Sequence, residues 1–317
     1  MAISHSFPYS DTNKRYHTQD YYYRHRFGCK TVKISLNGGF TCPNIDGSKG
    51  RGGCAFCTEG SGHFAGDPRL SVREQFEAGV KLTEKKWGGR ECLYIPYFQA
   101  NTNTYCPVSK LERLTDEALS CEKTVGIAVS TRPDCIAPDM LDFLADLSQR
   151  TYLTVELGLQ TIHDDTARRI NRCHTYADFL DAAHRLHSKG ILFCVHIIDG
   201  LPGEDRQMMM DTALALAKLP VHSVKIHLLH VLRGTPLAGE YERGEYVPLT
   251  KDGYIDIVCS QLEVFPPEFV IERLTGDGAK DDLMAPLWSR DKRSVLNGID
   301  KCLAARGTMQ GMRYTGI

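Results

Sequence analysis

Short apolar runs rich in β-branched residues alternate along the chain with longer segments whose apolar residues recur at helical spacing. Six of the short runs have the length and composition of strands. They cover residues 31–36, 91–98, 124–130, 152–159, 191–198 and 224–231. Helical segments separate neighbouring runs, the first at about 71–86. This order predicts repeated βαβ units, a parallel sheet and therefore an α/β fold.

The pattern changes after about residue 250. A helix is expected near 254–265, a further strand at 269–274, and a last helix at about 290–305 that Gly307 ends. The chain is therefore expected to have three parts. These are an N-terminal extension (1–30), a barrel-like α/β domain (31–250) and a C-terminal α/β extension that closes it (251–317).

Composition limits the class of protein. With 317 residues, the chain is long enough for one large α/β barrel or two ordinary domains. Its formal net charge of -1 gives no global basic field, so nucleic-acid binding would depend on a local patch. Most of the 12 cysteines are scattered singly, and Cys194 and Cys259 lie in apolar segments, as reduced core cysteines do. Because no signal-peptide core and no apolar run of about 18 residues occurs, we expect a soluble cytoplasmic protein without membrane contact.

Three cysteines stand in a loop after the first strand, at the spacing C-x11-C-x2-C. A glycine-rich stretch that can wrap closely around a compact group separates Cys42 from Cys54, and Cys57 follows. Paired thiolates at this spacing hold zinc ions or iron-sulfur clusters. A closed zinc site needs four ligands, and the next cysteine, Cys92, lies 35 residues further on without a CxxC partner. Three ligands without a fourth fit a 4Fe-4S cluster with one open iron.

Polar residues follow several of the predicted strands. Ligands bind at the carboxyl ends of parallel strands, so these residues are candidates for a site. After the second strand, the segment 97–105 is dense in hydrogen-bonding side chains, and its Gln99, Asn101 and Tyr105 are our candidate catalytic residues. Later strands lead into Ser130, Gln160, Arg172 twelve residues after Gln160, and a glycine-rich segment from His196 to Gly203.

The cysteine loop and the motifs that follow it resemble the radical S-adenosylmethionine (SAM) enzymes. The long first gap and the segment YFQANTNTY (97–105) are similar to the branch that contains the catalytic subunit of Elongator, which modifies wobble uridine in tRNA. The resemblance implies that Phe56 lies against the adenine of SAM. It implies that Gln160 and Arg172 contact the methionine and ribose portions, since a guanidinium can bind a carboxylate in a fork. It also implies SAM contacts from Ser130 and from the segment His196 to Gly203.

The resemblance covers about residues 30–275 and implies a fold and a chemistry. The fold would be a partial (β/α)6 TIM-like barrel of the radical SAM type with N- and C-terminal extensions. Cys42, Cys54 and Cys57 would hold a 4Fe-4S cluster whose free iron binds SAM. An electron from an external donor such as flavodoxin or ferredoxin would cleave SAM to methionine and a 5'-deoxyadenosyl radical, which the barrel would shield.

Three functions stay open from the sequence. The leading one is a radical SAM enzyme that modifies tRNA at a wobble-uridine side chain. The second keeps this chemistry but acts on a small metabolite or a protein side chain. The third is a zinc-bearing RNA-binding module without catalysis.

The segment 14–33 bears on an RNA partner. Lysines and arginines are interleaved there with tyrosines, with Asp20 as the single acid. Cations beside stackable rings are the ingredients of a single-stranded RNA surface. A lead-in that packs its tyrosines on the barrel would have the same composition, so both interpretations stay open.

Overall fold

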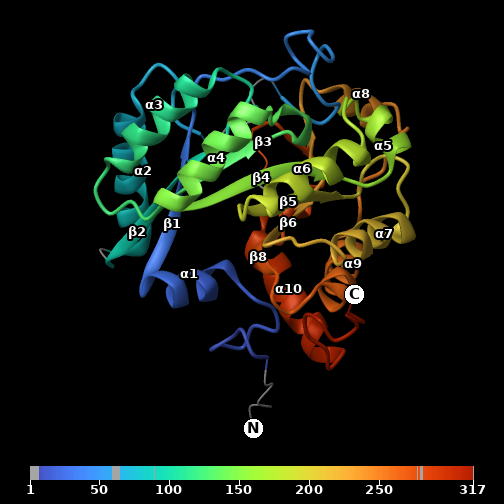
Figure 1. Cartoon of the computed structure of the whole chain (residues 1–317). Helices are drawn as coiled ribbons and strands as arrows, with labels where there is room; N and C mark the ends of the chain where they lie inside the picture. Colours follow the sequence, from blue (N-terminus) through green and yellow to red (C-terminus); the bar gives the residue numbers. More distant parts are fainter. Residues whose placement is uncertain (1–6, 59–64, 89, 277, 279–280, 317) are drawn as a thin grey trace.

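The computed structural model describes residues 7–58, 65–88, 90–276, 278 and 281–316. Within them, seven strands form one parallel sheet in the order β1-β2-β3-β4-β5-β6-β8 (Figure 1). The strands are β1 Lys30–Leu36, β2 Cys92–Phe98, β3 Gly126–Thr131, β4 Tyr152–Gln160, β5 Leu192–Asp199, β6 Ser223–Leu228 and β8 Val270–Arg273. Two short strands, β7 Val231–Leu232 and β9 Leu283–Ala285, pair with each other in antiparallel fashion.

Helices separate most of the strands and also flank them. They are α1 Gln19–Phe27, α2 Val72–Trp87, α3 Val108–Leu119, α4 Pro138–Arg150, α5 Asp164–Arg169, α6 Tyr176–Ser188, α7 Arg206–Leu216, α8 Pro236–Glu242, α9 Lys251–Val264 and α10 Lys292–Ala305. Two single 3-10 turns, Pro133–Cys135 and Leu287–Arg290, complete the elements.

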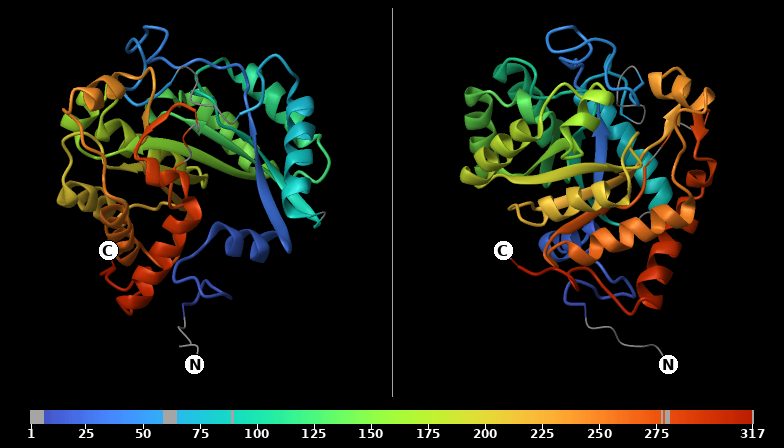
Figure 2. Two further views of the ribbon diagram at one scale, coloured as in Figure 1. Left: turned by 180° about the vertical axis from the view of Figure 1, so that it is seen from behind. Right: turned by 90° about the vertical axis from the view of Figure 1, so that its right-hand side faces the viewer.

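The sheet is curled into a half-barrel with helices on its outer face (Figures 1 and 2). Alternation along the strands explains the two faces. On β5, for example, Phe193, Val195 and Ile197 belong to the main hydrophobic core with the helices. The intervening His196 and Ile198 line an interior cavity. The apolar outer face therefore anchors the helices, and the inner face is left to polar side chains.

The N-terminal segment closes the half-barrel at the amino ends of the strands. His17 accepts a backbone hydrogen bond from Ile271 of β8 (N–O 2.7 Å), and α1 then crosses to β1. Tyr23 is buried, and its ring packs edge-on against Tyr152 at the start of β4. Arg24 pairs with Asp11 (2.7 Å) and with Asp20 (3.0 Å). The structure thus favours the interpretation that this segment packs its tyrosines on the barrel, and RNA binding by it stays a prediction.

The expected α/β fold is confirmed, and the sheet has one strand more than the six expected. The seventh, β8, comes from the predicted strand 269–274, whose place in the sheet the sequence did not indicate. The predicted run 224–231 is divided, because β6 ends at Leu228 and the chain then turns before β7. The three-part division at 30 and 250 stays an expectation.

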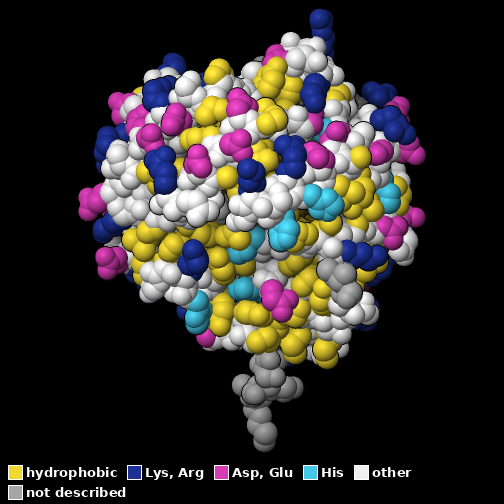
Figure 3. Space-filling view, viewed as in Figure 1, with side chains coloured by type: hydrophobic (Ala, Val, Ile, Leu, Met, Phe, Trp, Pro, Cys, Tyr) yellow, Lys and Arg dark blue, Asp and Glu magenta, His cyan; other side chains and the backbone are white. Residues whose placement is uncertain are grey.

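The surface is mixed in charge. On the face that carries α4 and α6, basic and acidic side chains are interspersed (Figure 3). In the part of the chain that the structure describes, none of the helices combines the length and the apolar character needed to span a membrane.

Candidate active site

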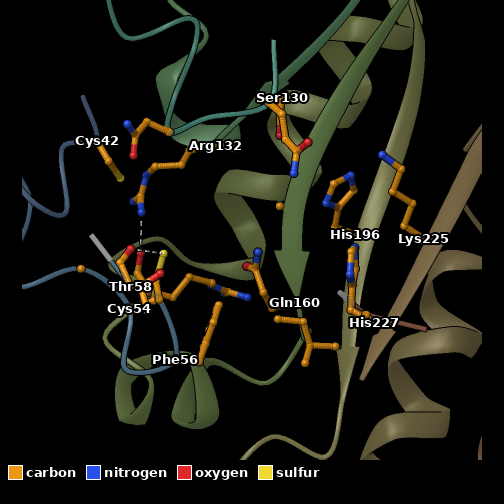
Figure 4. A pocket seen from close by; sticks show the side chains of 18 of the residues that line it. Cys42, Cys54, Phe56, Thr58, Ser130, Arg132, Gln160, His196, Lys225 and His227 are labelled. Carbon is orange, nitrogen blue, oxygen red and sulfur yellow. Dashed lines mark hydrogen bonds between the residues drawn. The ribbon is translucent and has the colours of Figure 1, made fainter. Parts of the chain in front are cut away.

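A cavity of about 520 Å³ lies between the cysteine loop and the inner face of the sheet. Most of the predicted site residues line it, namely Cys42, Cys54, Phe56, Cys57, Gln99, Asn101, Ser130, Gln160, Arg172 and His196. In Figure 4 the labelled cysteines stand on one side of the cavity and His196, Lys225 and His227 on the other, with Gln160 between them. The cavity therefore brings together side chains from the first loop and from all seven strands of the sheet.

Two predicted residues are not among those that line this cavity. Tyr105 is directed to the cysteine loop instead, where its hydroxyl donates to Ser48 Oγ at 3.0 Å. Gly203 is exposed and has a φ of 85°, so it serves the turn after β5, a conformation that favours glycine. A side chain at Gly203 would also meet the Arg169 guanidinium. The predicted roles of Tyr105 in catalysis and of Gly203 at SAM stay predictions without support from this geometry.

The cysteine loop is shaped by its own backbone hydrogen bonds. The carbonyl of Cys42 accepts from the N–H of Ile45 (2.8 Å), and that of Cys54 accepts from the N–H of Cys57 (2.9 Å). Gly52 and Gly53 have φ values of 78° and 74°, which residues with a Cβ adopt only with strain. The glycines thus let the chain return on itself and bring the first thiol to the other two.

The three thiols form a donor set that fits a cluster. All three are free and line the same cavity. Burial raises the pKa of Cys54 to about 11 and that of Cys57 to about 12, and repulsion from neighbouring thiolates contributes to both shifts. Ionising the thiols together therefore calls for cations inside the loop, which cluster irons supply. The Asn44 amide, 3.6 Å from Cys54 Sγ, can donate to that sulfur.

A single metal ion is a different case. In the described part of the chain, no three His, Cys, Asp or Glu side chains come close enough to hold one ion together. Because the irons of a cluster are separate atoms, a cluster accepts thiolates that are further apart than the ligands of one ion. The cysteine geometry therefore leaves the fit to a cluster unaffected.

The segment after α5 holds the cysteine loop in place. Asn171 Nδ2 donates to the carbonyls of Gly53 (2.7 Å) and Arg51 (3.1 Å). In return, the Asn44 side chain donates to the carbonyl of Asn171. The N–H of Ala55 donates to the carbonyl of Ile170 at 2.9 Å. Asn171 has a φ of 53°, a conformation that asparagine tolerates better than most residues.

Arg172 has a structural role that the sequence did not indicate. Its guanidinium is buried and donates to the carbonyls of Leu159, Thr161 (2.6 Å) and His174 (2.9 and 3.1 Å), with Asp164 3.5 Å away. These contacts use all five N–H groups of the guanidinium. The forked contact to the SAM carboxylate would need two of them to be released. The geometry therefore favours Arg172 as the clamp that fixes the end of β4 to the loop after α5.

The end of β4 is irregular where Gln160 enters the cavity. The register between β4 and β5 shifts between Gly158 and Gln160, and Gln160 has a φ of 64°. A left-handed conformation is costly for a residue with a long side chain, and such positions cluster at ligand sites. The predicted contact of Gln160 with SAM is compatible with this position.

The sequence did not single out a buried polar network at the floor of the cavity. Glu156, with 0% side-chain exposure, accepts hydrogen bonds from Lys33 (2.6 Å), Tyr97 (2.6 Å), His196 (2.7 Å) and Lys225. Glu272 of β8 lies 2.6 Å from Lys33 and 3.7 Å from Lys225. A carboxylate and an ammonium in otherwise apolar strands are the signal that could have revealed it.

The charges of this network balance. Burial alone would raise the pKa of Glu156, but Lys225 and Lys33 hold it well below its ordinary value. In the same way, Glu156 and Glu272 hold the pKa of Lys33 well above its ordinary value despite burial. Burial raises the pKa of Tyr97 and lowers that of His196, so both are neutral near pH 7. Two carboxylates therefore face two ammonium groups.

Comparison with known families agrees with the cysteine geometry. The model of the Radical SAM superfamily matches residues 47–216, and that of the Radical_SAM C-terminal domain matches residues 221–305. The chain belongs to the radical SAM superfamily. It is therefore an enzyme that uses a 4Fe-4S cluster and SAM, and this membership replaces the zinc-bearing, non-catalytic alternative.

The relatives of this radical SAM protein include full-length and partial matches. Protein YtqA of Bacillus subtilis is 48% identical over 312 residues, covering 98% of this chain and 96% of YtqA. A tRNA uridine(34) acetyltransferase of Methanocaldococcus jannaschii is 28% identical over 158 residues, which are 49% of this chain but only 29% of that protein. The structure of archaeal Methanocaldococcus infernus Elp3 has the same fold, with a TM-score of 0.67, 16% identity and coverage of 88% of this chain and 64% of that one.

The chain's own residues supply the setting for radical SAM chemistry. When bound, the cluster provides the electron that cleaves SAM and produces the 5'-deoxyadenosyl radical. Cys42, Cys54 and Cys57 would hold it, and Asn171 fixes the loop that carries them. The cysteine loop and the inner face of the half-barrel together line the cavity beside it.

Proposed function

We propose that this radical SAM enzyme modifies tRNA, and that its target is the side chain of the wobble uridine. The electron would come from an external donor such as flavodoxin or ferredoxin. The observation that carries the proposal is the charge-balanced floor of the cavity. Glu156 and Glu272 are matched there by Lys33 and Lys225, beside neutral His196.

A balanced floor suits an uncharged polar group. A charged metabolite that reached this floor would find the ammonium and carboxylate groups already paired with one another, and burying a charge without a partner is costly. A uracil ring is neutral and carries carbonyl and N–H groups along one edge. Such groups match the amide side chains of Gln99 and Asn101 and the imidazole of His196 in the cavity wall.

The partial relatives support the same substrate class. The protein from Methanocaldococcus jannaschii is named a tRNA uridine(34) acetyltransferase, and its similarity to this chain covers 158 residues. The structure of archaeal Elp3 shares the fold of this chain.

The test compares modified nucleosides in total tRNA from cells with and without the gene. A third strain carries the Cys54→Ser variant, so that loss of the cluster is separated from loss of the protein. We expect one modified uridine to be absent from both the deletion and the Cys54→Ser strain, and to return with the wild-type gene. Identical nucleoside profiles in all strains would reject tRNA as the substrate and favour a small metabolite or a protein side chain.

A further inference from the structure

His196 and Glu156 form a hydrogen-bonded pair inside the cavity. His196 Nε2 lies 2.7 Å from Glu156 Oε2, on the neighbouring strand. The side chain of Glu156 is fully buried, whereas 17% of the His196 side chain remains exposed. The carboxylate of Glu156 is therefore buried behind the ring, and His196 itself lines the cavity, where Figure 4 shows it.

The network around Glu156 settles the tautomer of the ring. Glu156 already accepts from Tyr97 and from two ammonium groups, Lys33 and Lys225, so it is a carboxylate and can only accept. Nε2 of His196 must then carry the proton of the shared hydrogen bond. In the neutral ring, Nδ1 consequently keeps its lone pair.

A second histidine lies beside the pair. The rings of His196 and His227 are 5.1 Å apart, and both line the cavity. Among the described residues, His227 Nε2 is buried without a hydrogen-bond partner. Buried polar atoms normally find one, so His227 is a hydrogen-bonding group with unmet capacity next to the pair.

We propose that His196 Nδ1 is a proton acceptor for the bound substrate and that Glu156 is the positioning residue that orients it. This assignment rests on the proposed function for the nature of the substrate, an uncharged N–H or C–H acid such as a uracil ring. It gives His196 a part in the reaction of the substrate in place of the SAM contact expected from the sequence.

The proton transfer balances within the pair. The bond from the proton to the substrate nitrogen or carbon breaks and a bond to Nδ1 forms, so the substrate gains one negative charge and the ring one positive charge. Glu156 is already ionised and stabilises the imidazolium at 2.7 Å. The arrangement needs no further reactant, because the proton is later returned to solvent or product.

The charged and titratable groups that face the ring come from every packed element. They are Lys33 on β1, Tyr97 on β2, Glu156 on β4, Lys225 and His227 on β6, and Glu272 and Arg273 on β8. Burial and Lys225 lower the pKa of His196, while Glu156 opposes this shift. The ring is therefore in its accepting form near neutral pH, and the rate of substrate modification falls as pH drops through the pKa of the ring.

The experiment uses the reconstituted full-length enzyme, SAM, a chemical reductant and tRNA from the deletion strain. His196→Ala is compared with His187→Ala, which removes an exposed histidine of α6. We expect the yield of modified uridine per 5'-deoxyadenosine to fall about 100-fold or more in His196→Ala. Added imidazole should restore it in this variant alone, because the ring's space is then open to a free base. The KM for SAM should stay as in the wild type.

Two results would overturn the assignment. An unchanged yield in His196→Ala would show that no proton passes through this ring. A loss that imidazole does not restore, together with a raised KM for SAM, would make His196 a SAM contact as the sequence implied. For Glu156→Gln, we expect the acid limb of the pH profile to move, since the amide no longer stabilises the imidazolium. If the acid limb of the pH profile stays where it is in the wild type, Glu156 does not position His196.

A spectroscopic measurement keeps this inference separate from the proposed function. If wild-type enzyme leaves the tRNA unmodified, the proposed substrate fails, and the assignment is decided on ¹⁵N-histidine-labelled full-length protein. Long-range ¹H–¹⁵N spectra at about pH 7, with His196→Ala to identify the resonance, should show a protonated Nε2 and an unprotonated Nδ1. A protonated Nδ1 would reject the proton-acceptor assignment whatever the substrate.

Discussion

Lys33 of β1 forms an ion pair with Glu272 of β8, with Nζ and Oε2 2.6 Å apart, although these strands are the two edges of the seven-stranded sheet. The contact is made across the interior, where both side chains are nearly buried, and Lys33 also reaches Glu156 at 2.6 Å. The curl of the sheet is what brings the edges within reach of one side chain. The network is therefore both the floor of the cavity and a tie across the open side of the half-barrel.

Removing the central carboxylate should destabilise the fold. In Glu156→Gln, the buried ammonium groups of Lys33 and Lys225 lose their shared partner, and breaking a buried ion pair from one side typically costs about 3–5 kcal/mol. We expect a loss of this size in the free energy of unfolding, measured with urea. The exposed Glu122→Gln should stay within about 0.5 kcal/mol of wild type. A Glu156→Gln protein as stable as wild type would show that the network does not hold the barrel together.

Acid should weaken the protein through buried histidines. Burial lowers the pKa of His222 to about 4, below its ordinary value of 6.5. The unfolded chain then binds the proton more readily than the folded one, so stability is full above about pH 6.5 and is lost as pH falls toward 4. Between about pH 7 and pH 4.5, the free energy of unfolding of the wild type should fall by about 2 kcal/mol more than that of His222→Gln. If the free energy of unfolding of the variant falls with pH as steeply as that of the wild type, His222 is not the cause of the loss.

The clamp on the cysteine loop should control how firmly the cluster is held. Asn171→Ala removes two hydrogen bonds to the carbonyls of Gly53 and Arg51, each lost partner costing about 1–3 kcal/mol when buried. We expect reconstituted Asn171→Ala to lose iron and absorbance near 400 nm faster in air than wild type. Asn297→Ala, an exposed change on α10, should behave as wild type. Equal decay in both variants would mean that the loop holds the cluster without this support.

The three cysteines should be separately required. Serine at Cys42, Cys54 or Cys57 should abolish the cluster and the reductive cleavage of SAM, because each is one of only three expected protein ligands. Cys106→Ser is the matched control, since Cys106 is half-buried outside the lining of the cavity. In every variant, the iron content measures the cluster and the formation of 5'-deoxyadenosine measures SAM cleavage. Loss of iron in Cys106→Ser would show that a ligand has been misassigned.

Sequence alone could predict the parts of this molecule that depend on local pattern. The apolar alternation located the strands to within a few residues, and the spacing of Cys42, Cys54 and Cys57 indicated the cluster loop. The prediction that the strands are parallel then placed Gln160 and His196 near each other, because the carboxyl ends of parallel strands lie on the same side of a sheet.

The contacts across the barrel could not be predicted from the sequence. Glu156 and Lys225 are single polar residues in apolar strands, and periodicity does not reveal which strands meet when a sheet curls. The donors of Arg172 are used by backbone carbonyls, which no motif can show. The tyrosines of α1 had two interpretations because stacking rings serve RNA and a hydrophobic core equally well.

The proposed chemistry requires a cluster that three cysteines hold and that leaves one iron for SAM. Electron paramagnetic resonance of the anaerobically reconstituted, reduced protein, recorded before and after SAM is added, tests this directly. We predict the signal of a reduced 4Fe-4S cluster whose g values shift when SAM binds the open iron. A protein without a reducible cluster, or a cluster signal that SAM leaves unchanged, would contradict the account.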